Sequence, residues 1–177
     1  MIIDFHTHMF PDKIAARTID FLSKTGGDMN PFTDGTWKGL KESTKQAGID
    51  HSIVLPIATR PGQFHTINEF ATHFQEGTLI SFGSLHPESE NYKEELKQIQ
   101  DMGMKGIKLH PDYQDTYFND IRYKRIISYA TELGLIISVH AGQDPKCPDN
   151  IHCTPAMAEE VLNEVEPEKL VLAHMGG

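Results

Sequence analysis

The sequence predicts an α/β fold of the TIM type, a (β/α) barrel, and three observations support this prediction. First, short apolar runs alternate with longer amphipathic stretches, as in a parallel sheet covered by helices. Second, the apolar runs contain few polar residues, which indicates strands that are buried on both faces. Third, the first run is followed by His-Thr-His-Met-Phe-Pro and not by the glycine-rich turn of a nucleotide-binding open sheet, so the barrel is preferred.

The individual elements follow from hydrophobic period and from punctuating residues. The predicted strands are residues 2–5, 52–57, 79–85, 106–109, 135–139 and 170–173. The predicted helices are residues 12–23, 37–47, 67–75, 92–102, 121–133 and 155–165. Four glycines stand where predicted helices would stop and are expected to end them with a positive φ, namely Gly48, Gly77, Gly103 and Gly134.

The length of the chain does not suffice for a whole barrel. An eight-stranded barrel needs roughly 250 residues, with about 200 as the lower end. The chain has 177 residues, and its sixth predicted strand is followed at once by Met175, Gly176 and Gly177. We therefore expect residues 1–177 to form a single barrel domain that is incomplete, with about six of the eight βα units, and truncated at its C-terminal end.

Composition and charge narrow the class of partner. The chain has 25 acidic and 16 basic side chains, a formal net charge of −9, which disfavours nucleic acid and membrane surfaces and favours a small-molecule substrate. The two cysteines form no disulfide framework, and the first residues do not resemble a signal peptide or a membrane span. These features predict a cytoplasmic protein, and they leave open whether it forms a homo-oligomer.

The ten histidines are the most informative feature of the composition. Several of them stand at the end of a predicted strand or just beyond it: His6, His8, His86, His110, His140 and His174. The carboxyl ends of barrel strands meet at one rim, where the loops build the active site. The sequence therefore predicts that these rings form one cluster.

His6 and His8 are two residues apart, so their side chains point to the same face of a strand and can share one metal ion. Alternatively, the two rings only hydrogen-bond to carbonyl groups in a turn. Because His140 ends another strand at the same rim, we favour a metal site made of His6, His8 and His140. His174 is assigned a catalytic role at the reaction centre, against the alternative of a merely packed ring.

Lys108 and His110 share one side of their strand. A buried lysine has to be paired, carbamylated or directed at an anion, because an isolated buried ammonium is too costly. We assign Lys108, His110 and His86 to substrate binding. His152 lies between Cys147 and Cys153 in a loop that is expected to line the pocket, since the cysteine spacing does not match structural zinc sites.

Four segments occur in an order that matches a known group of enzymes: Asp4-Phe5-His6-Thr7-His8, Gly106-Ile107-Lys108-Leu109-His110-Pro111, Val139-His140-Ala141-Gly142 and Ala173-His174-Met175-Gly176-Gly177. With them the sequence resembles the amidohydrolase superfamily, and more narrowly its amidohydrolase-related branch, which includes enzymes like aminocarboxymuconate-semialdehyde decarboxylase. The resemblance implies a (β/α)8 barrel and a divalent metal, usually zinc, held by His6, His8 and His140. It also implies that His174 assists at the reacting group, and that an aspartate on the eighth strand, beyond the end of this chain, completes the site.

The expected activity is that of a metal-dependent hydrolase, in which a metal-activated water attacks an amide, lactone or ester bond of a small molecule. This preference rests on the resemblance alone. One alternative is a metal-dependent, nonoxidative decarboxylase of a small unsaturated or aromatic carboxylate that Lys108 would hold. A second is a noncatalytic metal-binding fragment that lacks the aspartate of the eighth strand, and a third is a barrel whose histidines are only structural.

Overall fold

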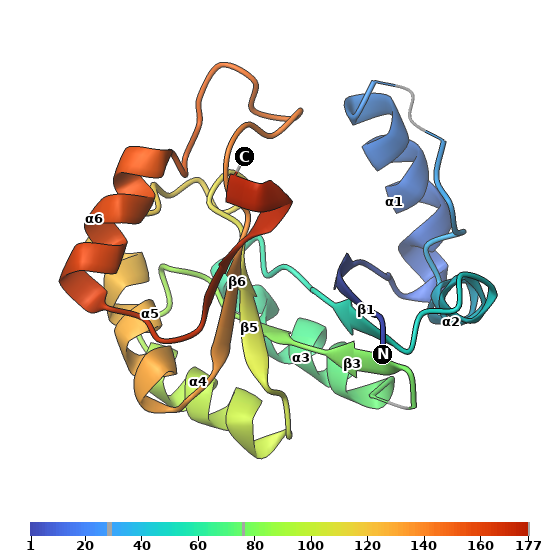
Figure 1. Cartoon of the computed structure of the whole chain (residues 1–177), viewed down its shortest axis with the longest axis horizontal. Helices are drawn as coiled ribbons and strands as arrows, with labels where there is room; N and C mark the ends of the chain where they lie inside the picture. Colours follow the sequence, from blue (N-terminus) through green and yellow to red (C-terminus); the bar gives the residue numbers. More distant parts are fainter. Residues whose placement is uncertain (28–29, 76, 177) are drawn as a thin grey trace.

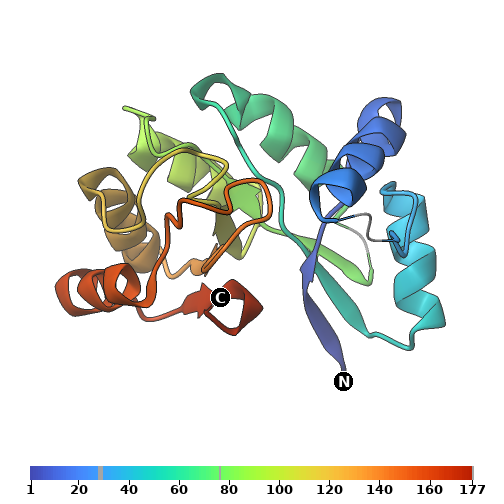
Figure 2. The ribbon, with the colours of Figure 1, turned by 90° about the horizontal axis from the view of Figure 1, so that it is seen from above.

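The computed structural model describes residues 1–27, 30–75 and 77–176, and in it parallel strands form an arc with helices along its outer side (Figures 1 and 2). The strands are β1 (Ile3–Thr7), β2 (His51–Val54), β3 (Leu79–Ser81), β4 (Gly83–Ser84), β5 (Gly106–Leu109), β6 (Ile136–Val139) and β7 (Leu170–Leu172). The helices are α1 (Asp12–Thr25), α2 (Trp37–Gln46), α3 (Phe64–His73), α4 (Tyr92–Asp101), α5 (Ile121–Glu132) and α6 (Pro155–Val165). Short 3-10 turns occupy Pro61–Gln63 and Ala173–Gly176.

The strands pair in parallel in two groups, with the orders β1-β2-β3 and β4-β5-β6-β7. The prediction of one strand over residues 79–85 is wrong at Phe82, where β3 ends and β4 begins. At this point the chain changes partners: the Phe82 N–H still donates to the Val54 carbonyl of β2 at 2.9 Å, whereas Gly83 pairs with Ile107 of β5. The break therefore joins two half-sheets within one arc.

The other element boundaries agree with the sequence prediction to within a few residues. Helix α3 starts earlier than expected because the turn at Pro61–Gln63 leads directly into Phe64. The four glycines expected after helices all have a positive φ, from 63° at Gly77 to 82° at Gly103. Among the described residues, no helix is both long and apolar enough to cross a membrane.

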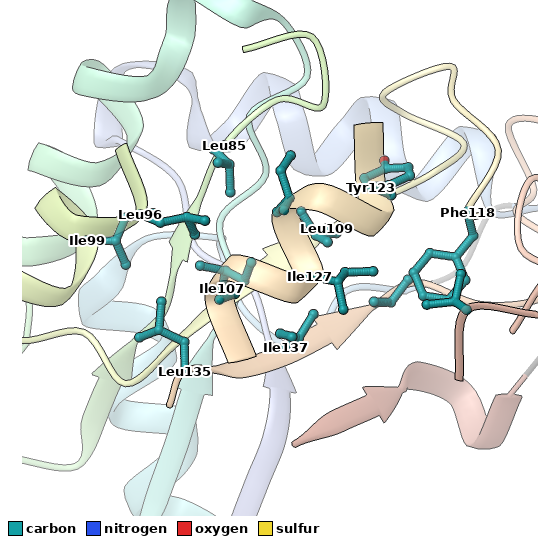
Figure 3. Packing of buried hydrophobic residues seen from close by; sticks show 14 of the residues in the cluster. Leu85, Leu96, Ile99, Ile107, Leu109, Phe118, Tyr123, Ile127, Leu135 and Ile137 are labelled. Atoms are coloured by element: carbon teal, nitrogen blue, oxygen red, sulfur yellow. The ribbon is translucent and has the colours of Figure 1, made fainter. Parts of the chain in front are cut away.

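The largest apolar core lies between the second half-sheet and the helices α4, α5 and α6 (Figure 3). All four residues of β5 are buried, and Ile107 and Leu109 have no exposed surface. The first half-sheet has a smaller core of Met9, Leu40, Val54 and Leu79. Strand β5, which contains Lys108 and leads to His110, and strand β6, which leads to His140, therefore both pack into the largest apolar core.

Candidate active site

The first pair of site residues comes from β1 and the residue just after it. The Nε2 atoms of His6 and His8 lie 3.1 Å apart. His8 donates its Nδ1 proton to the Leu55 carbonyl at 2.8 Å, because a carbonyl only accepts, so its Nε2 keeps a free lone pair. Two ligands of a tetrahedral zinc ion stand roughly 3.3–3.4 Å apart when each bond is 2.0–2.1 Å. The pair therefore fits one metal ion.

The second pair comes from the ends of β6 and β7. His140 Nδ1 and His174 Nε2 are 3.2 Å apart. His174 stands in the 3-10 turn after β7 with a left-handed backbone, φ 56°, and its ring centroid lies 4.7 Å from that of His6. The rings of His8, His6, His174 and His140 thus follow one another along the rim. The structure brings the four rings to one rim as expected. Among the described residues, however, His6, His8 and His140 do not form a group whose ligand atoms all lie within 4.8 Å of one another, and the individual roles stay predictions.

Two of the three residues assigned to substrate binding join this cluster. His110 stacks on His140 with ring centroids 4.1 Å apart, and Tyr113 covers its other face at 3.9 Å. Lys108 is fully buried, and its Nζ has no hydrogen-bond partner in the part of the chain that the structure describes. Burial lowers the pKa of Lys108 to about 7.

His86 lies apart from these residues. It is buried, and its Nδ1 accepts the backbone N–H of Glu88 at 3.2 Å. Among the described residues, no hydrogen bond or ring contact joins its ring to the histidines of the cluster. A role of His86 in substrate binding stays a prediction, and the contacts seen are those of a local loop.

The charge state of the rings suits metal binding. Burial, followed by the charge of Lys108, lowers the pKa of His6 to about 3. Burial, followed by the neighbouring His174, lowers the pKa of His140 to about 4. Both rings are therefore neutral near pH 7, which is the form in which histidine binds a metal ion.

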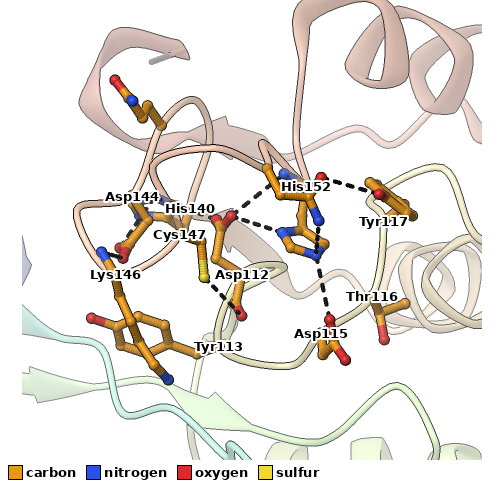
Figure 4. Close-up of polar contacts among 12 residues, drawn as sticks. Asp112, Tyr113, Asp115, Thr116, Tyr117, His140, Asp144, Lys146, Cys147 and His152 are labelled. Atoms are coloured by element: carbon orange, nitrogen blue, oxygen red, sulfur yellow. Dashed lines mark hydrogen bonds and ion pairs between the residues drawn. The ribbon is translucent and has the colours of Figure 1, made fainter.

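Sequence reasoning missed two buried carboxylates of the site, Asp112 and Asp144 (Figure 4). Asp144 Oδ2 lies 3.7 Å from Nε2 of His110 and 3.7 Å from Nε2 of His140. Asp112 Oδ2 also lies 3.7 Å from His140 Nε2, while its Oδ1 accepts from His152 Nδ1 at 2.9 Å. Their position in the loops just after two predicted strands was the available signal, because such loops build the rim of a barrel.

The described residues contain a group of three metal-capable side chains, His110, His140 and Asp144, whose ligand atoms all lie within 4.8 Å of one another. This group shares His140 with the ligand set predicted from the sequence and replaces His6 and His8 by residues of the neighbouring strand and loop. The site therefore has the donor atoms for a divalent metal, and two overlapping sets could supply them.

Histidines gathered at the carboxyl ends of parallel strands are the arrangement of an active-site rim in a barrel enzyme. The family model described as "Amidohydrolase" matches residues 3–177, so the chain belongs to the amidohydrolase family of enzymes. This confirms the resemblance inferred from the four segments. Among curated proteins, none matches this sequence closely.

Solved structures with a similar fold include three decarboxylases. They are the 5-carboxyvanillate decarboxylase of Sphingomonas paucimobilis (13% identity, TM-score 0.68, 99% of this chain and 68% of that one), the 2,6-dihydroxybenzoate decarboxylase complexed with 2,6-dihydroxybenzoate (14%, 0.69, 99% and 67%) and the dihydroxybenzoic acid decarboxylase of Polaromonas sp. JS666 with bound manganese and 2-nitroresorcinol (12%, 0.64, 99% and 65%).

These likenesses confirm the barrel-type α/β fold. The chain spans about two thirds of the length of these structures, between 65% and 68%. This agrees with the count of about six βα units out of the eight of a full barrel. That residues 1–177 form one truncated domain stays a prediction.

Acidification is expected to destabilise the metal-free protein. The unfolded chain takes up protons as the pH falls through about 6.5, whereas His6 and His140 take them up only near pH 3 and 4 in the folded state. The free energy of unfolding should therefore be highest above about pH 6.5 and fall as the pH is lowered toward 4. Urea unfolding in the presence of EDTA at pH 7.5, 6 and 5 measures this trend.

The test variant is His140→Gln. The matched control is His73→Gln, because His73 is exposed on α3. The His140 variant should lose stability less steeply with acid than the unmodified protein, and the His73 variant should follow it. Equal slopes for all three proteins would contradict the assignment of His140 as a neutral, buried ring.

Proposed function

We propose that the protein is a metal-dependent decarboxylase of a small unsaturated or aromatic carboxylate. The observation that carries this proposal is Lys108. Its ammonium group is buried beside the histidine cluster and has no hydrogen-bond partner within the described residues. An unpaired buried ammonium calls for an anion, and the carboxylate of a substrate supplies one.

The comparisons support the same reaction class. The similar structures named above are decarboxylases of aromatic acids by their names, and one of them holds manganese. The hydrolase expected from the sequence is the second candidate, and the description of the family model supports it. A divalent metal is common to both candidates. Zinc as the ion and the cytoplasm as the location stay predictions.

In this proposal His6, His8 and His140 hold the metal. The nitrogens of His6 and His8 form one close pair, and a His140 nitrogen forms another with His174, whose ring lies beside that of His6. A bound divalent ion would supply positive charge that stabilises negative charge developing on a substrate oxygen. The buried walls around Lys108 and His140 exclude water, which strengthens the attraction between the ammonium group and the substrate carboxylate.

His174 is placed to handle the proton. Its ring is exposed at the mouth of the cluster, with Nε2 at 3.2 Å from His140. In decarboxylation the bond between the carbon and its carboxylate breaks, the electron pair stays on the carbon, carbon dioxide leaves, and the carbon takes up one proton. His174 would hand over this proton and regain it from solvent.

The direct test is a substrate panel for the purified protein loaded with manganese or zinc. We expect carbon dioxide release from one or more aromatic or unsaturated carboxylates, and loss of this release after treatment with EDTA. Metal-dependent cleavage of amides, lactones or esters without carbon dioxide would favour the hydrolase. Stoichiometric metal without any turnover would favour the noncatalytic fragment.

Substitution of the predicted ligands should separate binding from catalysis. His6→Ala and His140→Ala are expected to weaken metal binding at least 100-fold, while His174→Ala should keep the metal and lower the rate 100- to 10,000-fold, a typical range for a lost proton-transfer group. Elemental analysis and steady-state kinetics measure the two effects, with His73→Ala as the control. Unchanged metal content in both ligand variants would refute the ligand set, and metal loss in His174→Ala would make that residue a ligand.

Lys108→Met should raise stability and lower activity together. Methionine removes a buried amine that has no hydrogen-bond partner among the described residues, so the free energy of unfolding should rise by about 1–3 kcal/mol. The same change should raise the KM for a carboxylate substrate tenfold or more. Lys105→Met, at an exposed lysine just before β5, should change stability by no more than about 0.5 kcal/mol. A destabilised Lys108→Met protein with an unchanged KM would contradict the anion-binding role.

A further inference from the structure

One ring nitrogen of His140 and one oxygen of Asp112 face each other in the interior. His140 Nε2 and Asp112 Oδ2 are 3.7 Å apart, and the two side chains are only 8% and 0% exposed. In residues 1–27, 30–75 and 77–176, neither atom has a hydrogen-bond partner. Because buried polar atoms nearly always find a partner, this contact needs an explanation.

The position of the single proton on His140 supplies one. A neutral imidazole carries its proton on one nitrogen and a lone pair on the other. Nδ1 faces His174 at 3.2 Å, on the side of the rim where His6 lies. Nε2 faces Asp112 and Asp144, each at 3.7 Å. Carboxylates only accept, so the proton belongs on Nε2 and the lone pair on Nδ1.

His110 has the same orientation. Its Nδ1 accepts the backbone N–H of Tyr113 at 3.4 Å, which leaves the proton on Nε2, 3.7 Å from Asp144 Oδ2. The His110 ring lies parallel to that of His140, with an interplanar angle of 10°. A protonated Nε2 has no lone pair to offer, which argues against a metal ion between His110, His140 and Asp144.

Hydrogen bonds to Oδ1 hold both carboxylates in place. They leave Asp112 Oδ2 near the His140 ring and Asp144 Oδ2 near the rings of His110 and His140. His152 donates to Asp112 Oδ1 from its ring at 2.9 Å and from its backbone at 3.4 Å. The backbone N–H of Lys146 donates to Asp144 Oδ1 at 2.8 Å. Figure 4 shows the Asp112 carboxylate beside His152 and the Asp144 carboxylate beside Lys146, so both are held by the loop that follows β6.

We propose that Asp112 and Asp144 are positioning residues that accept the Nε2 protons of His140 and His110 and so turn the His140 Nδ1 lone pair toward the metal. The present N···O separations are ~0.8 Å longer than a typical hydrogen bond, a gap that a small side-chain rotation closes. Carboxylates commonly hold the second nitrogen of a metal-binding histidine and raise its basicity. This inference rests on the proposed role of His140 as a ligand.

The first test measures zinc affinity by competition with a chromophoric chelator. Asp112→Asn and Asp144→Asn should each weaken zinc binding 10- to 100-fold, the usual effect of removing such a partner. The matched control is Asp149→Asn, an exposed carboxylate in the same loop as Asp144, which should bind zinc as the unmodified protein does. His6→Ala is included to check the ligand set independently.

Two results would overturn the proposal in distinguishable ways. If His6→Ala loses zinc while both aspartate variants keep full affinity, the metal site stands and the positioning role is wrong. If His140→Ala keeps full zinc affinity, the ligand role of His140 fails, and the positioning role fails with it.

A second measurement is made on the unmodified protein and uses a variant only to assign a signal. Nitrogen-15 NMR of the histidine rings reports which nitrogen carries the proton, and comparison with His140→Gln assigns the signal of His140. We expect the Nε2-protonated form without metal, and a zinc-dependent shift confined to Nδ1. A ring protonated at Nδ1, or a zinc-dependent shift at Nε2, would overturn the proposal and would instead indicate an ion between His110, His140 and Asp144.

Discussion

The site depends on the parallel register of the strands. Leu109 of β5 pairs with Val139 of β6, so the next residue on each strand, His110 and His140, emerges side by side and the two rings stack. The pairing of Val139 with Leu172 of β7 brings His174 to the same place. No local preference of a histidine could bring these rings together. The backbone ladder does so, and the buried apolar faces of β5 and β6 hold that ladder in place.

Much of this arrangement could be predicted from the sequence. Apolar runs locate strands, and a histidine at the end of a buried run lies at the rim of a parallel sheet, so the meeting of His6, His8, His140 and His174 followed from periodicity alone. Asp112 and Asp144 could not be found in that way. They belong to irregular loops, where no period relates sequence to position, and only the folded loops show that their carboxylates turn back onto the rings.

Two other features escaped sequence reasoning for different physical reasons. Residues 79–85 look like one buried strand in the sequence, but hydrophobicity does not show that the first half pairs with β2 and the second half with β5. His86 follows a buried run as His110 does, yet its Nδ1 accepts the Glu88 N–H of its own loop, and no hydrogen bond or ring contact joins it to the cluster among the described residues. The reaction class was also ranked differently: hydrolysis was expected first from the resemblance, whereas the reaction proposed above is the alternative, decarboxylation.

The change of partner at Phe82 has a mechanical consequence. His6 and His8 stand on the half-sheet with the smaller core, whereas His140 and His174 stand on the half with the larger core. An ion bound by nitrogens from both half-sheets would link them across the break at Phe82 and resist a hinge motion between them. Loading the protein with metal would then stiffen the arc as a whole, far beyond the few atoms that touch the ion.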